Sequence, residues 1–166
     1  MYSIISGTNR QGSNTLKVAE IYEQILQSKG IEVQLITLEG LDLSERNDSM
    51  RQLEKSYLIP SEKIIFVSPE YNGSIPGVLK TLIDNSDIEK VWKGKKALLV
   101  GVSSGRAGNL RGMDHLTAIL HYVKMIVHHN KLPISTISKL KDEHGDITDE
   151  ATLAAIHKQL DEFISF

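Results

Sequence analysis

The chain has 166 residues, of which 40% are hydrophobic and 24% charged, a composition that is ordinary for a globular protein and excludes a disordered or collagen-like chain. Nineteen basic and twenty-one acidic residues give a formal net charge of −2, so no overall positive field draws the protein to nucleic acid or to an anionic membrane. No apolar run approaches the ~18 residues that a membrane-spanning helix needs. We therefore expect one domain, residues 1–166, with no nucleic-acid and no membrane partner.

Cysteine is absent from the chain, which excludes disulfide bonds, a thiol nucleophile and a thiolate metal site. The first residues, Met1–Ile5, lead directly into a glycine turn and lack the basic region and the long apolar stretch of a signal peptide. Both features favour the cytoplasm, which is the location that we expect.

Patterns typical of strands and helices alternate along the first part of the chain. The apolar run Tyr2–Ile5 predicts a first strand, and apolar residues at helical spacing over residues 16–26 predict a helix that ends at Gly30. The alternating segment Ile31–Leu35 predicts a half-buried strand at the edge of a sheet, and a short helix over residues 50–58 follows it.

The same alternation continues to the end of the chain. Two unbroken apolar runs, Ile64–Val67 and Ala97–Val100, are typical of strands that are buried on both faces, and Met125–Val127 predicts a fifth strand. Apolar residues at helical spacing predict further helices over residues 76–83, 113–120 and 153–163. Five strands alternating with about five helices predict an α/β fold, a parallel sheet with helices on both faces.

Ligands of open α/β sheets bind beyond the carboxyl ends of the strands, so the loops after the first, third and fourth strands matter most. The first of these loops, Ser6–Thr15, is rich in glycine and hydroxyl side chains and leads into a helix whose first N–H groups are free. Thr8, Ser13 and Thr15 offer hydroxyl groups and Arg10 offers a positive charge. The loop therefore predicts a phosphate site.

Other interpretations of this loop remain. Ser13 can simply cap the helix while Gly7 and Gly12 bend the chain. A nucleotide-triphosphatase loop is excluded because Ser13 stands where that motif needs lysine, and no Gly-x-Gly-x-x-Gly supports a dinucleotide site of the Rossmann type.

The loop after the third strand, Ser68–Gly77, is too elaborate for a simple connection between a strand and a helix. Asn72 and the backbone amides can hydrogen-bond the polar edge of a ring, and Tyr71 can cover an apolar face of a ligand or a subunit contact. The alternative is a turn stiffened by its two prolines. We expect this loop to form a wall of the ligand site.

The loop after the fourth strand, Gly101–Gly108, contains Gly-x-Ser-x-Gly, the motif around the nucleophile of many serine hydrolases. Ser103 would be the nucleophile, with His157 and either Asp142 or Asp146 as its downstream partners. The loop is longer than such a motif allows before its helix, and hydrolysis leaves the other two loops unexplained. An esterase is therefore the less favoured interpretation.

Two other polar groups carry weaker signals. His128 and His129 are adjacent, and neighbouring residues on a strand point to opposite faces, so we expect a pair at the end of a strand that does not share a metal site, and we expect no metal. The segment 142–146 predicts a solvated turn before Thr148, which we expect to cap the last helix.

Taken together, the loop segments Gly7–Thr15 and Pro69–Gly77 resemble the phosphate motif and the most specific signature of the NAD(P)H-dependent FMN reductase family. These flavodoxin-like proteins include azoreductases and quinone or chromate reductases, and the resemblance covers nearly the whole chain. It implies a flavodoxin-like five-stranded parallel sheet and a single FMN-binding domain.

The resemblance also implies which residues contact FMN. The residues implied to bind the phosphate are Thr8, Arg10, Ser13 and Thr15, and Asn14 in the same loop is implied to bind the cofactor. Contacts to the flavin ring and the ribityl chain are implied for Pro69, Glu70, Tyr71, Asn72 and Gly73, and contacts to the pyrimidine edge for Ser103, Ser104 and Gly105.

The activity implied is two-electron, ping-pong transfer from NADPH or NADH through FMN to a small-molecule electron acceptor such as a flavin, a quinone or an azo compound. Because the cofactor carries the chemistry, we name no catalytic residue. An FMN-binding electron carrier that does not use NAD(P)H is the alternative, although flavodoxins proper are usually far more acidic.

The resemblance further implies a homodimer or homotetramer with the flavin between subunits. The helix after the third loop, with Val78, Leu82 and Ile83, is apolar enough to serve both the core and this interface. The physiological acceptor and the preference between NADH and NADPH stay open.

Overall fold

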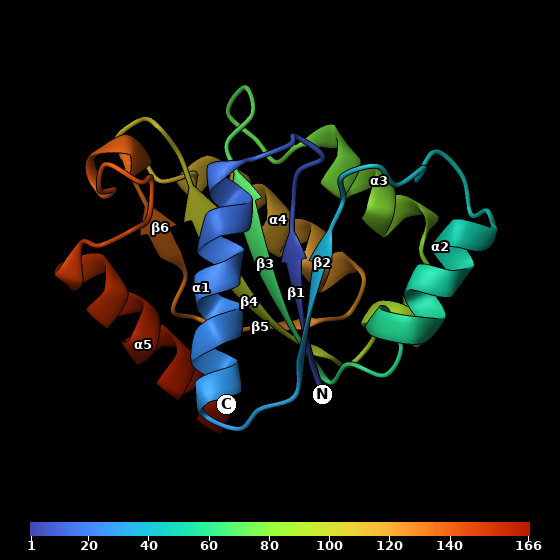
Figure 1. The fold of residues 1–166 in the computed structure, drawn as a ribbon. Helices are drawn as coiled ribbons and strands as arrows, with labels where there is room; N and C mark the ends of the chain where they lie inside the picture. Colours follow the sequence, from blue (N-terminus) through green and yellow to red (C-terminus); the bar gives the residue numbers. More distant parts are fainter.

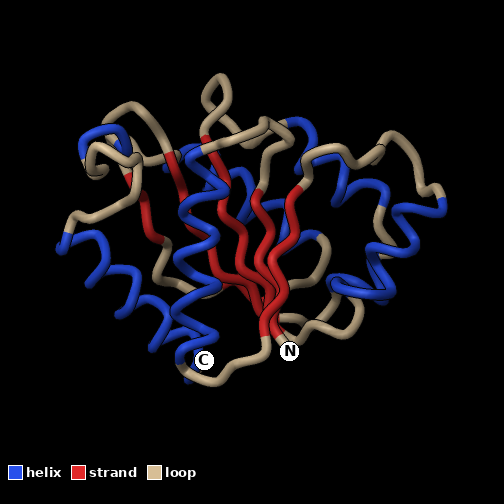
Figure 2. The backbone as a smooth tube through the Cα atoms, in the orientation of Figure 1, coloured by secondary structure: helices blue, strands red, loops and turns tan.

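The computed structural model describes residues 1–166 and has one parallel sheet between two layers of helices (Figure 1 and Figure 2). The strands are β1 (Tyr2–Ser6), β2 (Val33–Thr37), β3 (Lys63–Pro69), β4 (Lys96–Val102), β5 (Ile126–Val127) and β6 (Leu132–Ile134). They follow the order β2-β1-β3-β4-β5, with β6 also paired to β4, and every pair is parallel. This order is that of the flavodoxin-like fold, so the predicted fold is confirmed.

The helices cover both faces of the sheet, as the buried strands required. The longer helices are α1 (Asn14–Ser28), α2 (Asp48–Leu53), α3 (Gly77–Asn85), α4 (Leu110–Tyr122) and α5 (Glu150–Ser165). Short π-helical and 3₁₀ segments are η1 (Glu54–Leu58), η2 (Ile88–Trp92) and η3 (Ile137–Lys139). Figure 1 shows α1 and α5 on one face, and α3 and α4 on the other. None of these helices combines the length and the apolar character needed to cross a bilayer.

Each face of the sheet has its own hydrophobic core. Along β3, Ile64 and Phe66 belong to the cluster under α2, α3 and α4, while Ile65 and Val67 belong to the cluster under α1 and α5. All four side chains are buried, because successive residues of a strand point to opposite faces and both faces are covered.

The edges of the sheet differ from the prediction. The second strand begins at Val33 and extends to Thr37, so that Ile36 joins the core. The last strand is interrupted: β5 pairs with the start of β4 and β6 with its end, which makes six strands instead of five. Segment β6 contains Pro133, which has no N–H to donate. A strand at the edge of a sheet accepts proline because its outer side has no neighbouring strand that needs a donor.

Two predictions about polar residues are wrong. His128 and His129 do not point to opposite faces: they lie beyond the end of β5, and their ring centroids are 4.5 Å apart. Together with Glu162 they bring potential ligand atoms within 4.8 Å of one another. The last helix is capped by Asp149, whose carboxylate accepts the amide of Thr152 at 2.8 Å, and not by Thr148.

Candidate functional site

The loop between β1 and α1 presents unpaired backbone donors. Ser13 caps α1, because its Oγ accepts the amide of Leu16 at 3.1 Å. The amides of residues 11–15 donate to no acceptor within the protein, and the first turn of α1 contains no acidic residue. Arg10 lies beside them and is exposed. These free N–H groups at the positive end of a helix suit a phosphate group.

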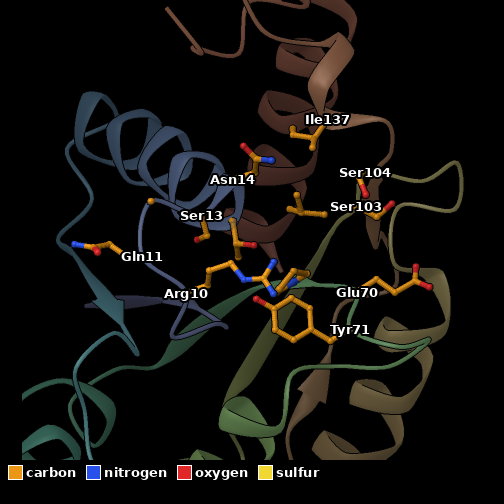
Figure 3. A pocket seen from close by; sticks show the side chains of 13 residues that line it. Arg10, Gln11, Ser13, Asn14, Glu70, Tyr71, Ser103, Ser104 and Ile137 are labelled. Carbon is orange, nitrogen blue, oxygen red and sulfur yellow. The ribbon is translucent and has the colours of Figure 1, made fainter.

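A cavity of about 320 Å³, which we call the first cavity, opens beside this loop at the carboxyl ends of the strands (Figure 3). Its walls come from the loops after β1, β3 and β4 and from η3. The lining residues are Arg10, Gln11, Gly12, Ser13, Asn14, Thr15, Pro69, Glu70, Tyr71, Val102, Ser103, Ser104 and Ile137. Most of the predicted FMN contacts are thus brought together in one place.

A second cavity, of about 390 Å³, shares Glu70, Ser103 and Ser104 with the first. Its lining residues are Glu70, Asn72, Gly73, Ser103, Ser104, Gly105, Arg106 and Ala107. The remaining predicted residues Asn72, Gly73 and Gly105 are found here. Thr8 alone among the predicted residues lines neither cavity.

Thr8 is buried under the first loop and organises it. Its hydroxyl shares a 2.7 Å hydrogen bond with the Tyr71 hydroxyl and accepts the amide of Arg10 at 3.2 Å. The Arg10 guanidinium in turn lies 4.8 Å from the centre of the Tyr71 ring, and Figure 3 shows it extended across the cavity toward that ring. Thr8 therefore positions two residues of the site.

The loop after β3 folds into a tight turn at the mouth of the site. Tyr71 and Ser74 exchange two backbone hydrogen bonds of 2.9 and 3.1 Å, and Asn72 and Gly73 between them have φ of 52° and 77°. Asparagine and glycine are the residues that tolerate this left-handed conformation, which explains the Asn-Gly sequence. The Glu70 amide donates to Val102 O at 3.1 Å and fixes the turn against the end of β4.

The hydroxyl of Ser103 holds its own loop together. It donates to Gly105 O at 2.9 Å and accepts the amide of Gly108 at 3.0 Å. Neither partner is a base, and the predicted partner His157 is exposed on α5. A serine whose hydroxyl proton is bound to a carbonyl is not activated for attack, so the geometry opposes the esterase interpretation.

Sequence reasoning missed six lining residues of the two cavities. Five of them lie inside the loops to which the sequence analysis gave a role, so the sequence did indicate their surroundings; they are Gln11, Gly12, Val102, Arg106 and Ala107. Ile137 had no signal, because only the fold brings η3 to the site, where its amide donates to Ser103 O at 3.1 Å.

Known proteins resemble this chain along most of its length. A family model described as NADPH-dependent FMN reductase matches residues 3–138. An NAD(P)H-dependent FMN reductase of Pseudomonas aeruginosa is 31% identical over 94% of this chain and 89% of its own length. A 2-hydroxy-1,4-benzoquinone reductase of a Burkholderia species is 24% identical over 99% of this chain and 94% of its own length.

Solved structures share the fold. The flavoenzyme NAD(P)H:(acceptor) oxidoreductase FerB of Paracoccus denitrificans superposes with a TM-score of 0.83 at 23% identity, covering 99% of this chain and 94% of its own. A flavodoxin from the domain Archaea superposes with a TM-score of 0.70 at 18% identity over the whole of both chains. The match to the family model and the identity to the Pseudomonas enzyme confirm the predicted family: the chain belongs to the NADPH-dependent FMN reductases.

Proposed function

We propose that the protein binds FMN in the first cavity and, extending into the second, uses it to transfer electron pairs from NADPH or NADH to a small acceptor such as a flavin, a quinone or an azo compound. The observation that carries this proposal is the set of unpaired amides of residues 11–15 beside Arg10. When bound, FMN would supply the two-electron chemistry, accepting electrons from the nicotinamide and passing them to the acceptor.

The residues present fit the cofactor. The amides at the start of α1, the Ser13 hydroxyl and Arg10 would hold the phosphate. The turn after β3 and the loop after β4 would flank the ring system. The amides of Ser104 and Gly105 donate to no protein acceptor, so they are free to stabilise negative charge on a bound ring.

No lining residue of either cavity belongs to an acid–base pair of the kind that a hydrolytic or proton-transfer mechanism would need. The Ser74 hydroxyl lies 2.9 Å from His115 Nδ1 beside the turn, but neither residue lines a cavity. Positioning and backbone donors are enough for a reaction in which the cofactor carries the electrons. Donor and acceptor would enter the same open site in turn, which is ping-pong behaviour.

An anaerobic titration tests the proposal against the electron-carrier alternative. The purified protein is expected to be yellow, to release FMN and not FAD on denaturation, and to lose its visible absorbance when NADPH or NADH is added without oxygen. Steady-state rates with a quinone should give parallel reciprocal plots. If bound FMN stays oxidised with excess NADPH and with excess NADH, the proposed reductase activity is contradicted and the electron-carrier alternative is favoured.

We also propose that two copies of the chain associate through a groove between α3 and α4. The groove measures about 410 Å³ and is lined by Lys80, Ile83, Asp84, Ile88, Ala118, Ile119, Tyr122 and Val123, six of which are hydrophobic. Tyr122 is 83% exposed, which is a large apolar surface to leave in water. Of the residues first expected at this interface, Leu82 and Ile83 are buried in the core and Val78 is half-buried, so exposed neighbours would make most of the contact.

A further inference from the structure

The arginines of this chain divide into two groups. Arg46 and Arg51 each form ion pairs with carboxylates, at 2.8 and 2.9 Å respectively. Arg10, Arg106 and Arg111 have no carboxylate within ion-pair distance. All three of these lie at the carboxyl ends of the strands, around the candidate site.

One of the unpaired arginines lines the second cavity and another lies beside it. Arg106 lines it, and the Nη1 atom of Arg111 lies 3.9 Å from the position that a Cβ atom on Gly73, another lining residue, would occupy. Both side chains are exposed. Glu70 is the one acidic lining residue of this cavity, and it makes no ion pair with either arginine.

The backbone adds donors to these charges. Beyond the two residues assigned to the flavin ring, the amides of Arg106 and Ala107 have no acceptor within the protein. The loop that carries them is held by the Ser103 hydroxyl and by a 2.9 Å bond from the Thr136 amide to Gly105 O. A fixed run of free N–H groups beside unneutralised guanidinium groups is suited to an anion.

We propose that Arg106 and Arg111 make the second cavity an anion subsite, which recognises a phosphate, sulfonate or carboxylate group on the substrate that reacts at the adjacent FMN. This rests on the proposed function and names its substrate class. The same chemistry can come from two sources, the 2′-phosphate of NADPH or an anionic group on the acceptor. Because ping-pong substrates use one site in turn, the subsite can serve both.

Paired substrates distinguish the two sources. With the FMN-loaded protein, kcat/KM is measured for 1,4-naphthoquinone against its 2-sulfonate, and for NADH against NADPH. Arg106→Ala and Arg111→Ala should each lower kcat/KM about threefold for the member of a pair that carries the additional anionic group, the sulfonate or the 2′-phosphate. The double variant should lower it about tenfold, because the free energies of exposed charge pairs are small and roughly additive. If kcat/KM falls selectively for the sulfonate, the subsite binds the acceptor. If it falls selectively for NADPH, the subsite binds the 2′-phosphate of the donor.

Arg51→Ala is the matched control, since it removes an exposed arginine on α2 whose charge is already paired with Asp48. This variant should leave kcat/KM unchanged for all four substrates. Raising the salt concentration from 20 to 300 mM should weaken the anionic preference of the wild type and have little effect on the double variant. If the Arg106 and Arg111 variants lower kcat/KM equally for both members of each pair, the proposal is overturned.

A binding measurement tests the subsite without relying on turnover. Naphthalene-2-sulfonate, which cannot be reduced by hydride transfer, is titrated calorimetrically into the protein with oxidised FMN and into the protein without it. Weaker binding in the double variant in either form supports the subsite even if NADPH fails to bleach FMN, the outcome that would refute the reductase. Binding of naphthalene-2-sulfonate that is unchanged in the double variant would refute the subsite alone.

Discussion

The Arg10 guanidinium is held over the first cavity by an aromatic ring and not by a carboxylate. Its position 4.8 Å from the centre of the Tyr71 ring is a cation–π contact, and Tyr71 is itself fixed by the Thr8 hydroxyl. An aromatic partner orients the charge without neutralising it, so the full positive charge remains available to a ligand phosphate.

Replacing Arg10 tests this assignment. Arg10→Ala should weaken FMN binding about tenfold to hundredfold, since a hydrogen bond to a charged group contributes about 1.5 to 3 kcal/mol. The dissociation constant follows from quenching of flavin fluorescence on titration into the FMN-free protein. Arg10→Lys should retain part of the affinity, because a lysine keeps the charge but lacks the planar fork. Identical affinities in all three proteins would refute the phosphate assignment.

Ser13 illustrates how far sequence reasoning reaches for a single residue. Helix capping and phosphate binding stood as alternatives, yet the structure makes them compatible. The Ser13 Oγ accepts the Leu16 amide as a cap, which leaves the hydroxyl hydrogen free to donate to a ligand. A sequence indicates the residue type at a helix start, whereas only coordinates tell which of its hydrogen-bonding capacities is already used.

At the scale of elements, the loop after β4 is pressed tightly against its surroundings. A Cβ atom on Gly101 would lie 2.1 Å from Gly108 O, and one on Gly108 would lie 2.6 Å from the Cβ of Pro133 in β6. The side-chain amide of Asn109 donates to Ser68 O at 2.9 Å and ties the start of α4 to the end of β3. Glycine at these positions therefore allows the close approach that shapes both cavities.

A methyl group on Gly101 should displace this loop. Gly101→Ala is expected to lower the free energy of unfolding by about 1 to 3 kcal/mol, the usual cost of overpacking, and to weaken FMN binding as the cavity walls shift. Urea unfolding and flavin titration measure the two effects. Gly77→Ala is the control, because a Cβ there meets no atom within 4 Å and φ is negative, and it should be neutral or stabilising. Wild-type stability of Gly101→Ala would contradict this account of the loop.

The predictability of the elements follows from their burial. The runs Ile64–Val67 and Ala97–Val100 were predicted correctly because strands covered on both faces must be apolar throughout. At the edge, the strand expected at Met125–Val127 is found as β5, but β6 was not expected, because three residues that include Pro133 carry no periodicity. Local pattern is therefore a good guide in the centre of this sheet and a poor one at its edge.

The site was predictable for a related reason. Its loops follow parallel strands, whose carboxyl ends must meet at one edge, so Ser13, Tyr71 and Ser103 were expected together and do line one cavity. Ile137 also lines this cavity. It lies in η3, which follows β6, and no pattern in the sequence predicted either element. The part of the site that was not predicted is thus the part formed by β6 and η3, which were not predicted either.

For the molecule as a whole, the neutral form of His128 makes stability depend on pH. Burial, and then the neighbouring charge of His129, hold the pKa of His128 below its ordinary value, against a weaker opposing pull from Glu162. Below about pH 6.5 the unfolded chain therefore binds a proton at this residue that the folded protein resists. Its contribution to stability is fully present above that pH and is lost as the pH falls toward the depressed pKa.

Urea unfolding at pH 7.5 and pH 5.5 should accordingly give a lower free energy of unfolding at the acidic value, with a slope from this residue of at most about 1.4 kcal/mol per pH unit. His128→Gln should reduce that slope. His157→Gln serves as the control, because His157 is exposed on α5, and it should leave the slope as in the wild type. A pH dependence that His128→Gln leaves unaltered would assign it to other groups.

The proposed association of two chains is the property of the whole molecule that bears most on the site. Tyr122 is 83% exposed at the groove between α3 and α4, so Tyr122→Glu places a charge where a second copy would bury it, and burying an unpaired charge costs several kcal/mol. Light scattering at micromolar concentration should therefore find a dimer or tetramer for the wild type and a monomer for Tyr122→Glu. Tyr57→Glu, at a tyrosine that is 38% exposed on η1, should leave the mass of the assembly unchanged. If the monomeric variant binds FMN and oxidises NADPH as well as the wild type does, then each chain carries a complete site and the partner contributes nothing to it.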